Sequence, residues 1–239
     1  MSSHLVPPLA DFKVGVDNVI FSVDIDLKRL LVLLSKRDEE PFSNRWSFPG
    51  ALVRQGESLE AAAQRVLFEK IQVKNLYLEQ LFSFGGPGRD PREEPEQYGV
   101  RYLSVSYFAL LSFQEAELLT KNLSRLAWHN IANIPELAFD HNEILNYGHQ
   151  RLQNKLKYSP IAFEVLPHFF TLYELYQLYA TVLGENFSDY SNFRTRLLKL
   201  GFLEDTGKKK FQKVGRPATL FCFNAQAFAP LREKPLVFL

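Results

Sequence analysis

The sequence has little of what covalent or metal cross-links require. Its 239 residues include one cysteine, Cys222, and five histidines. A single thiol cannot close an internal disulfide, and the histidines do not stand at the spacing of paired metal ligands. The sequence therefore argues against a disulfide scaffold and a structural zinc site, and it predicts neither a metal nor a cofactor.

Long apolar runs are absent as well. The longest uncharged apolar runs, such as residues 30–34 and 107–111, are five residues long, whereas a membrane-spanning helix needs about 20. The first twelve residues contain no Lys or Arg and no apolar core of a secretory signal. We expect a cytoplasmic protein with no membrane partner.

Charge is nearly balanced overall but uneven along the chain, with 28 basic and 27 acidic side chains in total. Residues 1–159 carry 18 basic against 20 acidic side chains, whereas residues 186–217 carry 8 basic against 3 acidic. A local basic stripe on a neutral protein is what a polyanion-binding element needs. A solvated face that aids solubility is the alternative, and charge alone favours that simpler interpretation.

Hydrophobic periodicity predicts a strand-rich region followed by a mostly helical one. The change falls near residues 158–160, where we expect the domain boundary. At residue 140 a long helix is predicted to open with Asp140 and Glu143 at the spacing of a capping box. In chain order the pattern predicts a flexible arm over 1–12, a hairpin over 14–23 and 27–35, a polar loop over 37–45, a short strand over 47–53 that Pro49-Gly50 interrupts, a helix over 58–71, strands over 76–84 and 100–111, a helix over 115–123, a strand over 128–131 and a helix over 140–157.

One segment has the spacing of a known catalytic motif. Residues 49–73 read PGALVRQGESLEAAAQRVLFEKIQV. They resemble the Nudix box, G-x5-E-x7-R-E-U-x-E-E-x-G-U, whose enzymes hold Mg²⁺ against a pyrophosphate. Glu57, Arg65 and Glu69 stand at box positions with the correct gaps. Glutamates three and four residues apart share one helix face, and their oxygens suit Mg²⁺.

Other box positions are substituted. Of the three helix positions that carry metal ligands in the family, only Glu69 is a carboxylate. Lys70 adds an ammonium where the dication would lie, and the repulsion costs on the order of 1 kcal/mol or more. The substituted positions are Ala51, Val66, Lys70 and Gln72.

These losses predict a Nudix-like scaffold without catalysis. Val66 and Lys70 remove two of the three metal-ligand carboxylates. We expect Glu57 and Arg65 to form an ion pair that braces the loop against the helix. The alternative is an active Nudix hydrolase that cleaves ADP-ribose-type nucleoside diphosphates with Mg²⁺.

A catalytically empty cavity can still bind a ligand. Guanidinium groups suit phosphate oxygens, so Arg89 and Arg92 of the GRDPR segment are candidates. Phe42 and Trp46 are candidates to stack on a base. The alternatives are an internal charge cluster around Asp90 and an ordinary packed loop. The complete set of candidate ligand-binding residues is Phe42, Trp46, Arg54, Glu57, Arg65, Glu69, Arg89 and Arg92.

The C-terminal region has the pattern of a winged helix. Residues 170–183 read FTLYELYQLYATVL and begin with the capping-box pair Thr171 and Glu174. Gly184 ends this helix, and a second helix is predicted over 188–200. Its apolar side chains share one face, and its polar and basic side chains share the other. A basic hairpin over 207–217, with a strand over 218–224, completes the pattern.

Basic and amide side chains on the outer face suit DNA. Asn192 suits adenine, and Arg194 or Arg196 suits guanine, in the major groove. A winged helix that binds another protein is the alternative, and the charge on both helix and wing favours DNA. The candidate DNA-binding residues are Ser191, Asn192, Arg194, Thr195, Arg196 and Lys199 on the helix, and Lys208, Lys209, Lys210, Lys213 and Arg216 on the wing.

Longer segments extend the resemblance over residues 14–224. They are YLEQLFSFGGPGRDPR, LAFDHNEIL, RLQNKLKYSPIAFEVLPHFFTLYELYQLY, NFRTRLL and GRPATLFCF. Together they resemble the Nudix-related transcriptional regulators, the NrtR family. In that family Asn192, Arg194 and Arg196 would fall in the DNA-reading helix, and Arg89 and Arg92 in its RDPR segment.

The resemblance implies an α+β protein. A Nudix-like α/β/α sandwich with a mixed sheet would span residues 13–158, and a winged helix-turn-helix domain 159–239. It further implies a homodimeric bacterial repressor that binds double-stranded operator DNA. The effector would be ADP-ribose or a related nucleotide of NAD metabolism, or, in one branch, a pentose such as arabinose.

Overall fold

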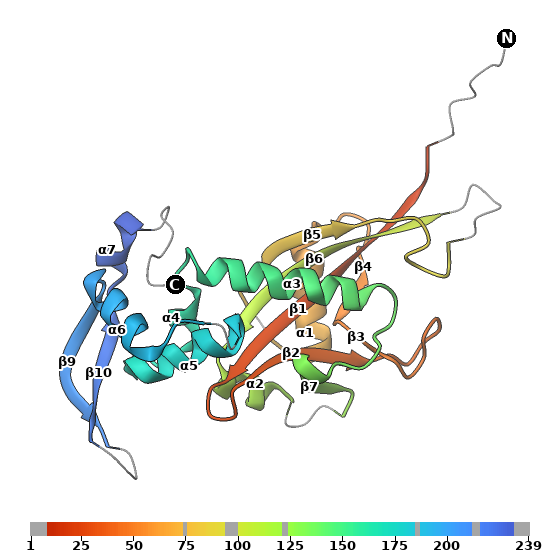
Figure 1. The fold of residues 1–239 in the computed structure, drawn as a ribbon. Helices are drawn as coiled ribbons and strands as arrows, with labels where there is room; N and C mark the ends of the chain where they lie inside the picture. Colours follow the sequence, from red (N-terminus) through yellow and green to blue (C-terminus); the bar gives the residue numbers. More distant parts are fainter. Residues whose placement is uncertain are drawn as a thin grey trace.

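The computed structural model describes residues 9–73, 76–93, 100–120, 124–184, 187–211 and 216–231 (Figure 1). Its elements are, in order, β1 (Phe12–Asp24), β2 (Arg29–Lys36), β3 (Trp46–Ser47), β4 (Gly50–Leu52), α1 (Leu59–Ile71), β5 (Glu79–Phe84), β6 (Arg101–Leu111), α2 (Phe113–Thr120), β7 (Leu126–Asn130), η1 (Ile131–Asn133), α3 (His141–Leu156), α4 (Ile161–Val165), β8 (Phe170–Thr171), α5 (Leu172–Leu183), α6 (Tyr190–Lys199), β9 (Leu203–Lys210), β10 (Ala218–Phe223), α7 (Ala225–Phe228) and η2 (Ala229–Leu231).

The N-terminal strands form one mixed sheet of seven strands. The order along it is β3-β2-β1-β6-β5, and β4 pairs with β1 while β7 pairs with β2. β1 and β6 are parallel from Phe12 opposite Arg101 to Ser22 opposite Leu111, and the other pairs are antiparallel. β1 is buried on both faces over its second half, where apolar residues are interspersed with the buried polar residues Asn18, Ser22 and Asp24.

Helices cover both faces of this sheet. α1 begins at Ser58, whose Oγ accepts a hydrogen bond from the N–H of Ala61. The buried side of α1, including Val66, packs against Val16 and Tyr107 on one face. α3 crosses the other face, as Figure 1 shows. The predicted α+β sandwich with a mixed sheet is confirmed.

α3 approaches the sheet closely at its middle. Gly148 stands where a Cβ would lie 3.3 Å from Val19, 3.4 Å from Leu81 and 3.5 Å from Phe21. A larger side chain would push the helix away from the sheet, so glycine permits this contact.

The predicted capping box at Asp140 and Glu143 is wrong. The Asp140 side chain makes no cap hydrogen bond to α3. Both of its oxygens instead accept hydrogen bonds from Arg89, which lies 51 residues earlier in the chain. A charge-assisted bidentate pair competes well with a single backbone N–H for a carboxylate.

Several predicted elements differ from the observed ones in their bounds. The strand predicted over 47–53, with an interruption at Pro49-Gly50, is two short strands, β3 and β4, and the break falls at Phe48 and Pro49. The helix predicted over 115–123 begins at Phe113, because Ser112 and Glu115 exchange hydrogen bonds that open it earlier. Its predicted end at 121–123 lies outside the described residues.

The C-terminal region is a winged helix. Thr171 and Glu174 form both hydrogen bonds of the predicted capping box at the start of α5. α5 and α6 pack through a core of aromatic and leucine side chains, and β8, β10 and β9 form a three-stranded sheet beside them. No helix in the described part of the chain is both long and apolar enough to cross a membrane.

The two regions share one hydrophobic core. Leu152 and Leu156 of α3 belong to the same buried cluster as Leu175 and Leu178 of α5. In Figure 1 the C-terminal end of α3 leads into the winged helix. The division at residues 158 and 159 stays a prediction, as does the arm over 1–12, most of which lies outside the described residues.

Candidate functional site

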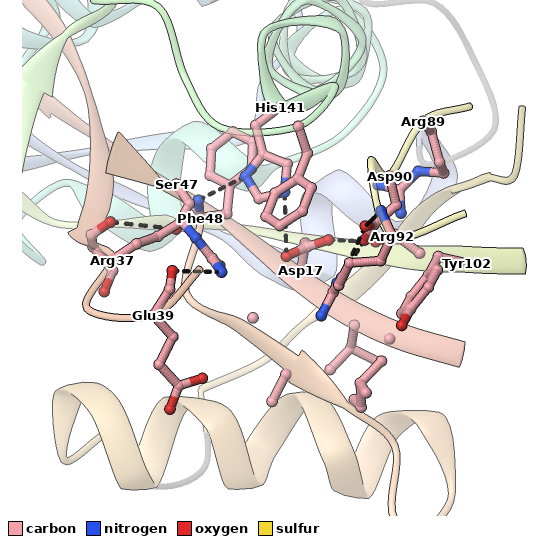
Figure 2. Close-up of a pocket in the computed structure, with 18 of the residues that line it drawn as sticks. Asp17, Arg37, Glu39, Ser47, Phe48, Arg89, Asp90, Arg92, Tyr102 and His141 are labelled. Atoms are coloured by element: carbon pink, nitrogen blue, oxygen red, sulfur yellow. Dashed lines mark hydrogen bonds and ion pairs between the residues drawn. The ribbon is translucent and has the colours of Figure 1, made fainter. Parts of the chain in front are cut away.

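A cavity of about 480 Å³, here called the central cavity, opens beside β1 (Figure 2). Strands β1, β2, β3, β4 and β6, helix α1 and the loops before α3 and after β5 contribute to its walls. Its volume lies within the range typical of small-ligand sites. Its charged lining residues are Lys36, Arg37, Lys70, Arg89 and Arg92, and Asp17, Asp38, Glu39 and Asp90.

Asp17 and His141 point toward each other in this cavity (Figure 2). His141 Nδ1 accepts a hydrogen bond from the Phe48 N–H at 3.0 Å, and its Nε2 lies 3.7 Å from Asp17 Oδ1. Burial lowers the pKa of His141, so the ring is neutral near pH 7. Because Nδ1 accepts, we assign the proton to Nε2, which faces Asp17. Ser104 Oγ donates to the other Asp17 oxygen at 2.5 Å.

Gly50 makes room for the Asp17 carboxylate. A Cβ at Gly50 would lie 2.0 Å from Asp17 Oδ1 and 2.8 Å from the carbonyl oxygen of Val16. Any larger residue would displace both groups, so the Pro-Gly turn before α1 is part of the cavity.

Rings and guanidinium groups alternate along one wall. The Arg92 guanidinium lies 4.3 Å from the centre of the Tyr102 ring and 5.7 Å from that of Phe139, and Arg37 lies 4.7 Å from Phe139. Phe139 has a left-handed backbone with φ of 56°, as does Phe42 with φ of 66°, and their rings meet edge to face at 5.0 Å. Such backbone conformations are costly for phenylalanine and cluster at functional sites.

Both arginines of the RDPR segment line the cavity, and both are paired. Arg92 donates twice to Asp90, at 2.8 and 2.5 Å. Arg89 donates to Asp140 at 2.8 and 2.6 Å. The internal charge cluster considered from the sequence therefore holds for Arg92 with Asp90, while Arg89 binds a carboxylate from a distant segment.

Lys70 lines the cavity from α1. Desolvation by the cavity walls lowers the pKa of Lys70, and repulsion from Arg37 lowers it further. In the described part of the chain neither Lys70 nor Arg37 forms an ion pair, and Arg37 donates to the backbone oxygens of Pro41 and Glu39. These cations can attract an anionic ligand.

The residues that match the Nudix box form a brace outside the cavity lining. Arg65 holds Glu57 through two hydrogen bonds of 2.7 and 2.9 Å and also donates to Glu69 at 3.2 Å. Arg54 pairs with the other oxygen of Glu69 at 3.1 Å. Hydrogen bonds from Arg65 and from the Arg54 N–H lower the pKa of Glu57 to about 2. The predicted ion pair between Glu57 and Arg65 is confirmed.

This brace does not fit Mg²⁺. Both box carboxylates accept hydrogen bonds from guanidinium groups, so their oxygens are already engaged. Within the described ranges no group of three or more His, Cys, Asp or Glu side chains could hold a metal ion.

The remaining ligand candidates lie near the cavity but not on its wall. The described residues that line the cavity do not include Phe42, Trp46, Arg54, Glu57, Arg65 or Glu69. The Phe42 ring contacts the ring of Phe139, which does line the cavity, and the Trp46 ring contacts His129 with ring centres 4.6 Å apart. Sequence reasoning missed Asp17, Arg37 and His141 because their segments meet only in the fold. The one local signal was Lys70, a cation at a position that carries a metal ligand in the family.

The candidate DNA-reading helix presents its polar face to solvent. Phe193 and Leu197 are buried, while Arg194, Arg196 and Lys199 are exposed, as are Ser191, Asn192 and Thr195. Asp189 caps α6 by accepting from the N–H groups of Ser191 and Asn192, and its other oxygen accepts from the Asn192 amide.

The cations of the wing differ in their partners. Lys210 pairs with Glu174 at 2.6 Å, and Lys208 lies 4.9 Å from the centre of the Phe169 ring. Lys209 and Arg216 are exposed, and Lys213 lies outside the described residues. Within the part of the chain that the structure describes, Arg194, Arg196, Lys199 and Lys209 form no ion pair.

Two family models match the chain. A NUDIX domain matches residues 12–147, and the AraR C-terminal winged HTH domain matches residues 158–239.

Individual proteins match across most of the chain. The ADPR responsive transcriptional repressor NtrR of Acinetobacter baylyi is 35% identical over 217 residues, which cover 89% of this chain and 82% of the relative. The crystal structure of Shewanella oneidensis NrtR complexed with a 27mer DNA is 33% identical, with a TM-score of 0.75 over 93% of this chain and 98% of that one. The NUDIX domain of Shewanella oneidensis NrtR complexed with ADP ribose is 31% identical, with a TM-score of 0.50 over 63% and 95%. The chain therefore belongs to the NrtR-like transcriptional regulators, which join a NUDIX domain to an AraR-type winged helix.

Proposed function

We propose that this protein is a repressor that binds operator DNA through α6 and the wing and releases it when an ADP-ribose-type nucleotide occupies the central cavity. The proposal rests on two features of the same chain. One is a polar cavity whose wall carries cations without an ion pair among the described residues, and the other is an exposed basic helix, α6. Helix α3 connects the cavity to the winged helix. A transcriptional regulator works at the chromosome, which is consistent with the expected cytoplasmic location.

The cavity chemistry supports a ligand with a diphosphate. Arg37 and Lys70 are cations on its wall without an ion pair among the described residues, and Arg89 and Arg92 are further guanidinium groups there. Guanidinium and ammonium groups bind phosphate strongly in a site shielded from water. The Acinetobacter relative is ADPR responsive, and the Shewanella NUDIX domain was crystallised with ADP ribose.

A pentose such as arabinose is the second candidate effector. Asp17 and Glu39 on the cavity wall can accept hydrogen bonds from sugar hydroxyl groups. The winged helix also matches the AraR model. A pentose would occupy only part of a cavity of about 480 Å³, so we favour the nucleotide.

We propose no catalytic role for the box residues. The alternative, an active hydrolase, requires Mg²⁺-dependent turnover that Glu69→Gln abolishes. Glu57 and Glu69 are held by Arg54 and Arg65, which supports a non-enzymatic function.

We also propose a homodimer. Two recognition helices on a C2 dimer must lie about 34 Å apart to reach successive major grooves. Light scattering coupled to size exclusion should give the mass of two chains of 27.6 kDa, and a monomer that binds its operator as one copy would contradict this.

Calorimetric titration with ADP-ribose and Mg²⁺, with arabinose in parallel, tests the effector. We expect a saturable ADP-ribose isotherm without continuing heat. Continuing heat after each injection would mean turnover and would overturn the non-enzymatic proposal. A silent ADP-ribose titration with an arabinose isotherm would replace the nucleotide with the sugar.

DNA release completes the test. A duplex selected from a random-sequence library by the wild-type protein serves as the operator probe. ADP-ribose at saturating concentration should weaken binding of this duplex at least about tenfold, the lower end of ordinary allosteric coupling. An unchanged affinity would contradict the proposed function.

A further inference from the structure

The first turn of α3 is tied to three walls of the central cavity. Asp140, which precedes the helix, is bound by Arg89 from the loop after β5. His141 accepts the Phe48 N–H at 3.0 Å and faces Asp17 at 3.7 Å. Cavity residues therefore hold the start of α3 in place.

Asp140 uses its side chain for Arg89 and not for its own helix. A residue at this position ordinarily caps the helix by accepting an N–H from the first turn. Asp140 makes no such side-chain bond, and only its backbone carbonyl serves α3, accepting from Glu143 at 2.9 Å and Ile144 at 3.1 Å. An Asp140 released from Arg89 is no longer tied to the cavity wall, so the start of α3 is free to shift and its first backbone hydrogen bonds are weakened.

Arg89 stands where a ligand can compete for it. Its side chain is 8% exposed and lines both the central cavity and a second cavity of about 380 Å³ behind the loop after β5. A phosphate presents paired oxygens to a guanidinium in the same way as a carboxylate. A phosphate in the central cavity and the Asp140 carboxylate therefore compete for the same two donors.

The other end of α3 contacts the winged helix directly. Gln153 Nε2 donates to the Val182 carbonyl of α5 at 3.0 Å, and Leu152 and Leu156 are buried with leucines of α5. A shift at the start of α3 is transmitted by a continuous helix to the region that carries α6.

We infer that Arg89 exchanges Asp140 for a phosphate group of the ligand, and that Asp140 is the positioning residue through which the cavity sets the place of α3. The inference rests on the proposed function, because it concerns how the same cavity acts on the same winged helix. It assigns the nucleotide's phosphate, and not its sugar or base, to the release of DNA.

The Asp140→Asn variant separates this role from a merely structural one. Asparagine is as good a helix cap as aspartate but cannot hold Arg89 by charge. Removing the competing carboxylate should raise ADP-ribose affinity about tenfold, as expected from the loss of a charge-assisted pair. It should also weaken binding of the selected duplex before any ligand is added. A structural role predicts unchanged or weaker ADP-ribose binding, and either result would overturn the inference.

Asp24→Asn is the matched control. Asp24 also pairs with an arginine, Arg29, at 2.8 Å, and its side chain is 3% exposed against 16% for Asp140, but it lies at the end of β1 and outside the cavity lining. This variant should leave ADP-ribose affinity and duplex binding within twofold of wild type. An affinity gain equal to that of Asp140→Asn would show that the effect is not specific to α3.

Hydrogen exchange on the wild-type protein gives a second test that needs no variant. Ligand binding ordinarily slows exchange around its site. The inference expects ADP-ribose to speed exchange of the Glu143 and Ile144 amides, because Asp140 leaves its position. Slower exchange there, with ADP-ribose bound and DNA released, would overturn the inference and leave the proposed function intact. A wild-type protein that neither binds ADP-ribose nor releases DNA would instead fail the proposed function.

Discussion

Two largely buried arginines of the sandwich and two exposed arginines of α6 have opposite surroundings. Arg65 and Arg89 have side chains 14% and 8% exposed, and each is bound to a carboxylate. Arg194 and Arg196 are exposed and form no ion pair in the described parts of the chain. A paired, buried guanidinium fixes the fold and can bind an anion only by exchange, whereas a free one is available to phosphate at once. The same residue type therefore performs two tasks, and its partners decide which.

The largest expected effect comes from removing the free cations of α6. Arg194→Ala with Arg196→Ala should weaken binding of the selected duplex about 100-fold, roughly tenfold for each guanidinium. The slope of log affinity against log salt should fall by about two. Fluorescence anisotropy at several salt concentrations measures both, and Arg54→Ala, an exposed cation of the sandwich, is the control. Unchanged affinity in the double variant would remove α6 from the DNA interface.

The next effect concerns a paired cation and appears in stability. Arg65→Gln should lower the melting temperature by several degrees near pH 7, because Glu57 loses its partner. The folded-state pKa of Glu57, about 2, lies below its ordinary 4.5. The contribution of the pair is therefore fully present above about pH 4.5 and is lost as the pH falls toward 2. Melting curves from pH 7 to pH 2 should show the two proteins converging, and a constant gap would contradict this account.

A smaller contrast lies within the wing itself. Lys209 forms no ion pair with any residue that the structure describes, whereas Lys210 is paired with Glu174. Lys209→Ala should reduce duplex affinity several-fold and lower the salt slope by about one. Lys210→Ala should reduce affinity less and instead lower the melting temperature slightly. Equal losses of DNA binding would mean that pairing in the free protein does not set which lysine meets DNA.

The smallest expected effect is that Lys70→Glu gains no metal binding. Lys70→Glu restores an acidic residue to the box, but Glu57 and Glu69 stay bound to Arg65 and Arg54. We expect no Mn²⁺ binding by electron paramagnetic resonance at millimolar metal. Binding by this single variant would show that the arginine pairs yield readily to a cation.

The elements that the sequence predicts well carry their own local signals. Ser58 caps α1, and Thr171 with Glu174 caps α5, so the residues that open each helix lie beside it in the chain. The hairpin of β1 and β2 follows from two apolar runs and a short turn between them. These features depend on neighbours within a few residues, which a sequence displays directly.

The site is less predictable because its partners are distant. Asp140 looks like a helix cap in the sequence, and only the fold brings Arg89 to it from 51 residues away. Asp17 gives no sign of its role, since the glycine that admits its carboxylate is Gly50 on another strand. The Nudix spacing located the brace, which lies outside the cavity lining, and Lys70 is the substituted box residue on the helix that lines the cavity.

Gly148 has a mechanical consequence for α3. At this residue a Cβ would lie within 3.5 Å of side chains of the sheet, those of Val19, Phe21 and Leu81. At 1.5 Å per residue, about 10 Å of helix precedes this contact and about 12 Å follows it. A rotation of α3 about Gly148 therefore moves its two ends by similar distances in opposite directions. A displacement at the cavity end is matched by one of similar size at the end that contacts the winged helix.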